Sequence, residues 1–213
     1  MRIAVLFYGR INKCIQCYDS IMNSIKGPED SNVNTEIDVF LSSDNPDAEL
    51  LDEFVRLYNP VAYTGDLIIY PPEYDLPSSR SETNVPNMIR HFINKSRVFN
   101  LLEMHVEKTN QMYDVVLSIR LDLTIYTPFL FDSVQKNTIY IPNCYDWVDN
   151  AINDQIAYGD MESMGKYMIL FHNMLHLIQT GKSIVHPESL TLANIRMHEL
   201  NIVRFEFSYI IER

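Results

Sequence analysis

Positive charge is scarce in this sequence. Its 213 residues include 17 lysines and arginines against 28 aspartates and glutamates, which gives a formal net charge of −11 at pH 7. A protein that binds nucleic acid broadly needs clustered lysine and arginine, and an anionic membrane surface makes the same demand. The composition therefore predicts neither nucleic acid nor a membrane surface as a partner. A nucleotide held by a few focused cations remains compatible with it.

Cysteine and long apolar runs are also scarce. Three cysteines are an odd number in a chain large enough to fold without disulfides, so reduced thiols are expected. No run approaches the roughly 20 apolar residues of a membrane span, and the start, MRIAVLFYGR, is too short an apolar run for a signal peptide. We therefore expect a cytoplasmic protein without a transmembrane segment. The 46% hydrophobic content fits a single domain over residues 1–213, or the N-terminal part of a longer multidomain protein.

Strand and helix patterns alternate along much of the chain. Short apolar, β-branched runs predict strands, and apolar residues at helical spacing predict helices. The predicted strands span Ile3–Phe7, Ile37–Leu41, Val61–Thr64, Val115–Ile119 and Thr138–Ile141. The predicted helices span residues 11–25, 47–58, 86–106, 161–177 and 186–200, and an extended segment over 202–211 follows them. This alternation predicts an α/β layer fold with a largely parallel sheet.

The strand over Val115–Ile119 ends in two opposite charges. Arg120 and Asp122 follow its apolar residues, before Leu123–Ile125 resumes the apolar pattern. Because an unpaired buried charge is costly, we expect both side chains where the strand emerges at its carboxyl end. That edge of an open α/β sheet binds ligands; a carboxylate there suits a hard divalent ion, and a guanidinium suits a phosphate. The alternative is an internal Arg120–Asp122 pair that only closes the strand.

Other charged residues near predicted strand ends are candidates for nucleotide contacts. Gly9 and Arg10 form the turn between the first strand and its helix, although Gly9 could equally serve only to relieve a tight turn. Arg90, Lys95 and Arg97 make the first half of the long predicted helix basic. These three are candidates to balance a diphosphate, and a solvated helix face is the alternative.

Two long segments lack a helix or strand pattern. Residues 65–85, rich in proline and tyrosine, could form a lid, a sugar-binding wall or a flexible surface loop. Residues 143–160 combine aspartates, tyrosines and the only tryptophan, Trp147, without lysine or arginine. Aromatic faces and carboxylates are what a sugar pocket uses, so Asp154 is a candidate contact for a sugar or its acceptor. The alternative is an exposed acidic loop in which Asp154 caps a helix.

Cys14 and Cys17 form a CxxC motif near the start of the first predicted helix. The motif raises a thioredoxin-like redox function. No second CxxC or histidine pair completes a zinc site. Because the two residues share a helix face and free cysteine packs as a small hydrophobe, we favour a packing role.

Five short stretches, spread over most of the chain, carry a resemblance to known enzymes. They are AVLFYGR, IDVFLSS, YDVVLSIRLDL, NDQIAYG and HPESL. Together they resemble the GT-A class of nucleotide-sugar glycosyltransferases, and more narrowly the chlorella virus enzymes that build capsid glycans. The resemblance implies a three-layer α/β/α fold around a mostly parallel, mixed sheet. It also implies a metal-dependent hexosyl- or deoxyhexosyltransferase that moves a sugar from a UDP-sugar to a glycan or glycoprotein acceptor, in the host cytoplasm if viral.

The resemblance also assigns site residues. In that class an Asp-x-Asp motif holds Mn²⁺ or Mg²⁺ against the diphosphate, but Arg120 here replaces the first aspartate. Asp122 is then the implied metal ligand, with Arg120 as a phosphate contact. The remaining implied contacts are Phe7, Tyr8, Gly9, Arg10, Ser42, Ser43 and Arg97 for the nucleotide, and Asp154 and Glu188 as catalytic residues on the acceptor side. The alternative function is a non-catalytic nucleotide- or glycan-binding module of a larger enzyme.

Overall fold

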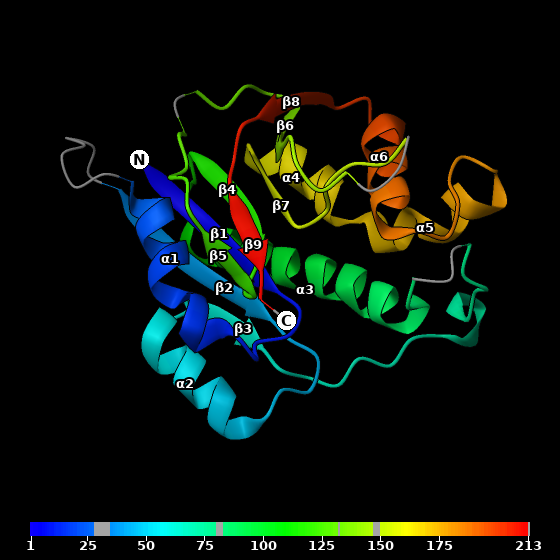
Figure 1. Cartoon of the computed structure of the whole chain (residues 1–213). Coiled ribbons are helices and arrows are strands. Elements are labelled where there is room, and N and C mark those ends of the chain that lie inside the picture. Colours follow the sequence, from blue (N-terminus) through cyan, green and yellow to red (C-terminus); the bar gives the residue numbers. More distant parts are fainter. Residues whose placement is uncertain (28–34, 80–82, 132, 147–149, 213) are drawn as a thin grey trace.

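A mixed sheet of seven strands forms the centre of the described part of the protein (Figure 1). The structure is a computed structural model and describes residues 1–27, 35–79, 83–131, 133–146 and 150–212, so Trp147 lies outside it. The strands, in the spatial order β3-β2-β1-β4-β7-β6-β8, are β1 (Arg2–Tyr8), β2 (Glu36–Ser42), β3 (Ala62–Thr64), β4 (Val115–Arg120), β6 (Thr138–Pro142), β7 (Ile156–Gly159) and β8 (Asn201–Phe205). β3, β2, β1 and β4 run parallel to one another and β8 runs parallel to β6, whereas β7 is antiparallel to both of its neighbours, β4 and β6. The predicted α/β fold with a mostly parallel, mixed sheet is confirmed.

Six α-helices within the described residues cover both faces of this sheet. They are α1 (Cys14–Lys26), α2 (Ala48–Tyr58), α3 (Val85–Thr109), α4 (Met161–Met168), α5 (Leu170–Gln179) and α6 (Pro187–Met197). A short 3-10 helix, η1 (Pro72–Tyr74), interrupts the loop before α3. Helices on both faces are compatible with a three-layer α/β/α arrangement (Figure 1). None of the described helices combines the length and the apolar character needed to cross a bilayer.

Side chains along β1 point alternately to the two faces of the sheet and pack in a hydrophobic core on each face. Its odd-numbered residues from Ile3 to Phe7 pack with α1 and α2, whereas its even-numbered residues from Ala4 to Tyr8 pack with α3 and α4. Every one of these side chains is at most 1% exposed. Full burial of a large aliphatic or aromatic side chain contributes about 1.5–3 kcal/mol, so β1 anchors the fold from both faces.

A second, two-stranded sheet lies against α1. β5 (Leu123–Ile125) pairs antiparallel with β9 (Tyr209–Ile211). The extended segment predicted over 202–211 is therefore divided between two sheets, because β8 joins the large sheet and β9 the small one. This pairing brings the end of the described chain beside the residues that follow β4.

The helix predicted over residues 161–177 is wrong as a single element. It breaks at Ile169, between α4 and α5. Met164 of α4 packs in the core beneath the sheet, whereas Leu170 of α5 packs in a separate core with the first half of α3. The break lets the two halves direct apolar side chains into different cores.

The loop predicted over residues 143–160 is also wrong in part, because it contains β7. All four residues of β7 are buried, and the strand fills the space between β4 and β6. A Cβ atom at Gly159 would lie 2.8 Å from the carbonyl oxygen of Thr138 on β6. Glycine is thus required where the two strands approach closely.

Candidate functional site

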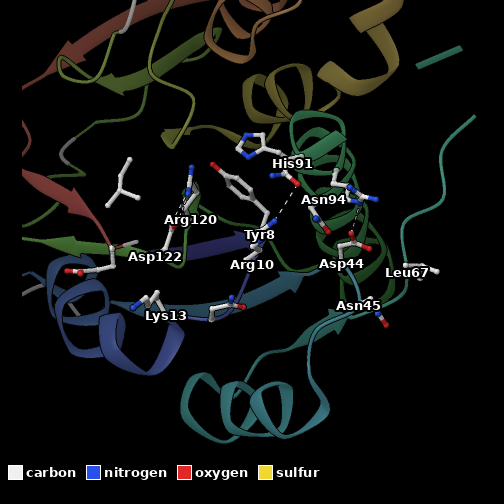
Figure 2. Close-up of a pocket in the computed structure, with 16 residues that line it drawn as sticks. Tyr8, Arg10, Lys13, Asp44, Asn45, Leu67, His91, Asn94, Arg120 and Asp122 are labelled. Atoms are coloured by element: carbon white, nitrogen blue, oxygen red, sulfur yellow. Dashed lines mark hydrogen bonds and ion pairs between the residues drawn. The ribbon is translucent and has the colours of Figure 1, made fainter. Parts of the chain in front are cut away.

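A cleft of about 810 Å³ opens at the carboxyl ends of β1 and β4 (Figure 2). The two strands are neighbours, but the chain runs outward from β1 through β2 and β3 before it returns to β4 on the other side of β1. Such a reversal of strand order is a topological switch point, where open α/β sheets bind ligands. The lining comes from the β1–α1 turn, the ends of β2 and β4, the first half of α3 and the end of β9.

Four cations line this cleft in a protein whose net charge is −11. They are Arg10 and Lys13 from the β1–α1 turn, Arg90 from α3 and Arg120 from the end of β4. Three carboxylates, of Asp44, Asp122 and Glu212, also line it. The cleft lining is therefore slightly positive within a strongly acidic protein, which favours an anionic ligand there.

Arg10 and Lys13 have no carboxylate partner among the described residues. Arg10 Nη2 donates a hydrogen bond to Asn87 Oδ1 at 3.4 Å. Lys13 Nζ donates to Gln16 Oε1 at 3.5 Å, on its own helix. Both partners are neutral amides, so the two positive charges stay available to a ligand.

Arg120 and Asp122 form the ion pair that the sequence offers as an alternative to a ligand site. Arg120 Nε donates to Asp122 Oδ1 at 2.8 Å, and Nη2 donates to Oδ2. Burial lowers the pKa of Arg120, but the hydrogen bond and charge of Asp122, together with the charge of Asp154, raise it above its ordinary value. The guanidinium thus stays charged. Each carboxylate oxygen of Asp122 also keeps a second lone pair for another ligand.

Asp122 is not the only carboxylate at this side of the cleft. The N–H of Glu212 donates to the Asp122 carbonyl at 2.8 Å, and its carboxylate accepts a hydrogen bond from Thr124 Oγ1 at 2.6 Å. No three histidine, cysteine, aspartate or glutamate side chains of the described chain gather into a metal site. One or two carboxylates together with substrate phosphates are, however, a set that Mg²⁺ uses. The residues present therefore fit a divalent ion bound along with a diphosphate.

Gly9 follows β1 directly and lines the cleft. Its φ of +93° is a conformation that side chains other than hydrogen rarely allow, and its N–H donates to the Ser42 carbonyl at 3.0 Å. An added Cβ would meet no atom within 4 Å. Gly9 thus serves the tight turn that the sequence predicts and leaves open space on the cleft side.

Asp154 lies behind the part of the cleft wall formed by Tyr8 and His91. Its Oδ2 is 3.4 Å from His91 Nε2. Its carbonyl oxygen accepts hydrogen bonds from the Tyr8 hydroxyl at 3.1 Å and from Lys95 Nζ at 3.0 Å. Asp154 does not cap a helix, because α4 is capped by Asp160, so that alternative is wrong.

Lys95 is buried between two aromatic rings rather than solvated on the surface of α3. Its Nζ lies 4.4 Å from the ring centroid of Tyr167 and 5.2 Å from that of Tyr8, and donates to the Tyr167 hydroxyl at 3.0 Å. Burial lowers the pKa of Lys95 from 10.5 to about 8, although the charge of Asp154 acts in the opposite direction. Lys95 fastens α3 to the segment before β7 and does not line the cleft.

Four residues assigned to the nucleotide by resemblance lie off the lining. They are Phe7, Ser42, Ser43 and Arg97. Phe7 is fully buried among the rings of α2, and Ser42 Oγ donates to Asn94 Oδ1 of α3 at 2.8 Å. Ser43 is 2% exposed, and Arg97 Nη1 donates to the Asp66 carbonyl at 2.9 Å. In the structure these residues support the elements around the cleft from behind.

Glu188 lies in the first turn of α6, also off the cleft lining. Its side chain is buried, and its Oε2 lies 3.3 Å from His186 Nε2. The Glu188 carbonyl accepts a hydrogen bond from the N–H of Ile152 at 3.3 Å. Glu188 is thus connected to the segment that carries Asp154.

The loop over residues 65–85 contributes one described side chain, Leu67, to the cleft. Tyr74 instead stacks on Phe171 of α5, with ring centroids 4.7 Å apart. Neither Tyr70 nor Tyr74 is part of the lining, so these tyrosines do not form a sugar-binding wall there. Residues 80–82 of the loop lie outside the described chain.

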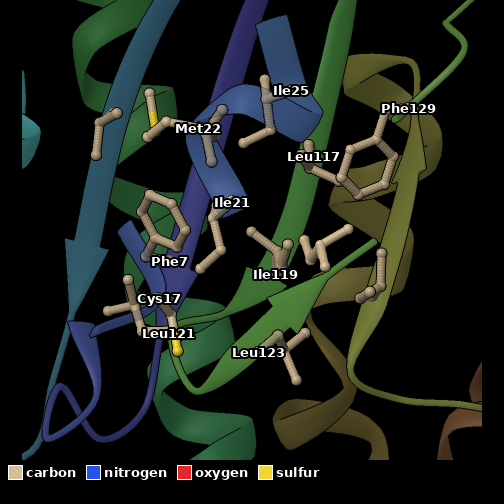
Figure 3. Packing of buried hydrophobic residues seen from close by; sticks show 14 of the residues in the cluster. Phe7, Cys17, Ile21, Met22, Ile25, Leu117, Ile119, Leu121, Leu123 and Phe129 are labelled. Atoms are coloured by element: carbon tan, nitrogen blue, oxygen red, sulfur yellow. The ribbon is translucent and has the colours of Figure 1, made fainter. Parts of the chain in front are cut away.

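Cys14 and Cys17 are free, fully buried thiols on α1, and Figure 3 shows Cys17 within the hydrophobic core. Burial raises the pKa of both, that of Cys14 to about 11. Thiolate is the reactive form of cysteine, so these thiols are unreactive at neutral pH. The packing role favoured by the sequence is confirmed.

Sequence reasoning missed several lining residues, including His91. The sequence does carry a pattern for the missed residues of α3. Asn87, His91 and Asn94 share one helix face with Arg90, at helical spacing, and all four line the cleft. This polar stripe interrupts an otherwise apolar pattern. Glu212 carries no such signal, because its place depends on the pairing of β9 with β5.

Comparison with known proteins gives no family for this chain. No protein-family model matches it, and a search of curated proteins found no match. The function therefore has to be inferred from the chemistry of the cleft and from the residues that carry the resemblance.

Proposed function

We propose that the protein is a GT-A-type glycosyltransferase that moves a sugar from a UDP-sugar to a glycan acceptor, with Mn²⁺ or Mg²⁺ bound against the diphosphate. One observation supports this best. Arg10 and Lys13, which have no carboxylate partner among the described residues, line the cleft at the topological switch point together with the carboxylate of Asp122. Cations bind phosphate oxygens, and the Asp122 carboxylate would be a ligand for a divalent ion beside them. The five sequence stretches support sugar transfer and a uridine donor.

The chemistry requires that negative charge on the leaving diphosphate be stabilised. As the bond between the anomeric carbon and the phosphate oxygen breaks, Arg10, Lys13 and Arg120 offer fixed positive charge without any proton transfer. Asp122 and Glu212 would hold a divalent ion, which would supply Lewis-acid stabilisation of the same charge. Arg120 suits this role because its charge persists across the physiological pH range.

The sugar and the acceptor belong beyond the phosphates, on the side of Tyr8 and His91. We assign Asp154, behind that wall, to the sugar side, and Glu188 to the acceptor side. The resemblance extends the proposal to a hexosyl- or deoxyhexosyltransferase for viral capsid glycans, acting in the host cytoplasm. The alternative, a non-catalytic binding module, would bind UDP and leave a radiolabelled UDP-sugar intact when the acceptor is supplied.

Calorimetric titration of UDP tests the cleft directly. We expect Arg10→Gln and Lys13→Gln each to weaken UDP binding about tenfold, the effect of losing one charge-assisted hydrogen bond. Arg196→Gln and Lys182→Gln are matched controls, because they remove the same charges from exposed positions off the lining. Equal UDP affinity in all five proteins would contradict the assignment, and tighter binding of GDP than of UDP would contradict the donor.

A further inference from the structure

The cleft wall contains a histidine with an enclosed nitrogen that lacks a hydrogen bond. His91 lines the cleft from α3, yet its Nε2 is completely buried. Asp154 Oδ2 lies 3.4 Å from Nε2, but the contact lacks hydrogen-bond alignment. A buried polar atom left in this state destabilises a protein, so it calls for a functional explanation. Contacts of this kind often tighten when a substrate binds.

The imidazole ring of His91 is held in place and is neutral. Its ring packs edge to face with those of Tyr8 and Phe92, at centroid distances of 5.0 and 5.3 Å. Burial lowers the pKa of His91 well below its ordinary value, and the charges of Lys95 and Arg120 lower it further. At neutral pH one ring nitrogen therefore carries a proton and the other a lone pair.

Asp154 selects which nitrogen carries the proton. A carboxylate facing Nε2 attracts an N–H and repels a lone pair, so the proton belongs on Nε2. Nδ1 then carries the lone pair. Nε2 is enclosed, whereas the His91 side chain as a whole is 17% exposed and lines the cleft, so the rest of the ring is the part that a ligand can reach. His91 thus offers the cleft a hydrogen-bond acceptor.

The backbone of Asp154 is held in position by two buried donors from different elements. Tyr8 of β1 and Lys95 of α3 both donate to the Asp154 backbone carbonyl. Both side chains are at most 2% exposed, so neither can leave without opening the core. The residue that carries the carboxylate is therefore anchored beside His91 before a ligand arrives, as a specific binding site requires.

We propose that His91 recognises one hydroxyl group of the transferred sugar through Nδ1, and that Asp154 holds the ring in the tautomer that accepts this hydrogen bond. The inference rests on the proposed function, because it places a sugar beside the diphosphate. The wall formed by Tyr8 and His91 faces the same cleft as the phosphate cations Arg10, Lys13 and Arg120. A sugar joined to the diphosphate therefore reaches this wall directly.

The consequence is selection against donors deoxygenated at one position. A site built to pair with a hydroxyl rejects an analogue that lacks it, since the acceptor is covered by the bound sugar and is then left unpaired. The transferred sugar is accordingly one that is hydroxylated at the position facing His91.

Calorimetry with UDP-glucose, UDP-galactose and their monodeoxy analogues tests this assignment. Each donor affinity is divided by the affinity for UDP alone, which isolates the contribution of the sugar. In the wild-type protein we expect removal of one particular hydroxyl to lower this ratio roughly tenfold or more. In His91→Leu the same removal should change nothing, because the acceptor is gone.

Two further variants separate hydrogen bonding from shape. His91→Asn can place an amide oxygen near the position of Nδ1 and should keep most of the discrimination. Asp154→Asn can present an N–H to Nε2, which moves the imidazole proton to Nδ1. The hydroxyl would then accept from Nδ1–H instead of donating to Nδ1, so a deoxyfluoro donor, which accepts but cannot donate, should be penalised less in this variant than in the wild type.

An equal penalty for the missing hydroxyl in wild type and His91→Leu would show that the hydroxyl is recognised elsewhere. The inference is also overturned if every monodeoxy donor binds the wild-type protein as tightly as its parent. Absence of UDP binding by the wild type would instead overturn the proposed function itself. The UDP reference titration distinguishes this last outcome from the other two.

Discussion

Asp122 belongs both to an ion pair with Arg120 and to the cleft lining. We expect Asp122→Asn to lower turnover of a UDP-sugar about 100-fold or more, because the amide keeps the packing but loses the charge that binds a divalent ion. Turnover and melting temperature are measured on the same preparation. Asp146→Asn is the matched control, since Asp146 pairs with Arg204 off the lining. If the Asp122 variant unfolds, Asp122 serves chiefly as the structural partner of Arg120.

Single residues next to strand ends could be placed from the sequence, and residues placed by packing could not. Gly9, Arg10 and Asp122 line the cleft because parallel strands end at a common edge, and this rule needs only the strand pattern. Whether His91 lines the cleft depends on which face of α3 packs against β1. The position of Glu212 depends on a strand pair between segments that lie far apart in the sequence. Neither property is local.

Among the elements, the long apolar runs were predicted and the four-residue strand β7 was not. β1, β2 and β4 carry continuous β-branched or aliphatic runs, and α3 carries a long helical period. β7 has four residues, of which alanine and glycine have little strand propensity. The break between α4 and α5 serves two separate cores, so it follows from tertiary packing rather than from propensity.

β7 itself offers a test of how closely the central strands are packed. We expect Gly159→Ala to lower the free energy of unfolding by about 1–3 kcal/mol, because its Cβ would meet the backbone of β6. Urea unfolding measures the change. Gly165→Ala on α4 is the control: its Cβ would lie 3.1 Å from the ring of Phe99, a side chain that can shift, and helix propensity partly offsets the contact. A larger loss in the control than in Gly159→Ala would contradict this account.

For the protein as a whole, burial of Lys95 makes stability depend on pH. Its pKa is about 8 in the folded protein against an ordinary 10.5, so above pH 8 the unfolded chain holds more protons than the folded one. Stability therefore rises with pH through this window. We expect the unfolding free energy of the wild type, relative to Lys95→Met, to increase by about 1 kcal/mol from pH 7 to pH 9.

Chemical denaturation at several pH values provides this difference. Cys14 has a raised pKa and acts in the opposite direction above pH 9, so the comparison stays below that value. A difference that does not change with pH would mean that Lys95 keeps an ordinary pKa in the folded protein.

Ligand binding should also register in the stability of the whole protein. A ligand that binds only the folded state at 100 times its dissociation constant adds about 2.7 kcal/mol. We expect UDP with Mn²⁺ to raise the melting temperature more than UDP with a chelator, because the ion joins Asp122 to the diphosphate. Equal shifts under both conditions would argue against a metal ion in the site. Adenosine diphosphate with Mn²⁺ serves as the control for nonspecific binding of phosphate.

The strand pair β5–β9 has a consequence for synthesis of the protein. Ile211 and Glu212 line the cleft, yet their partner strand lies at residues 123–125. A ribosome adds about 5–20 residues per second and releases the chain N-terminus first. A nascent chain that ends before β8 therefore already carries all four cations of the lining but lacks this wall. The cleft lining is complete on that side only when residue 212 has emerged, after every strand of the seven-stranded sheet.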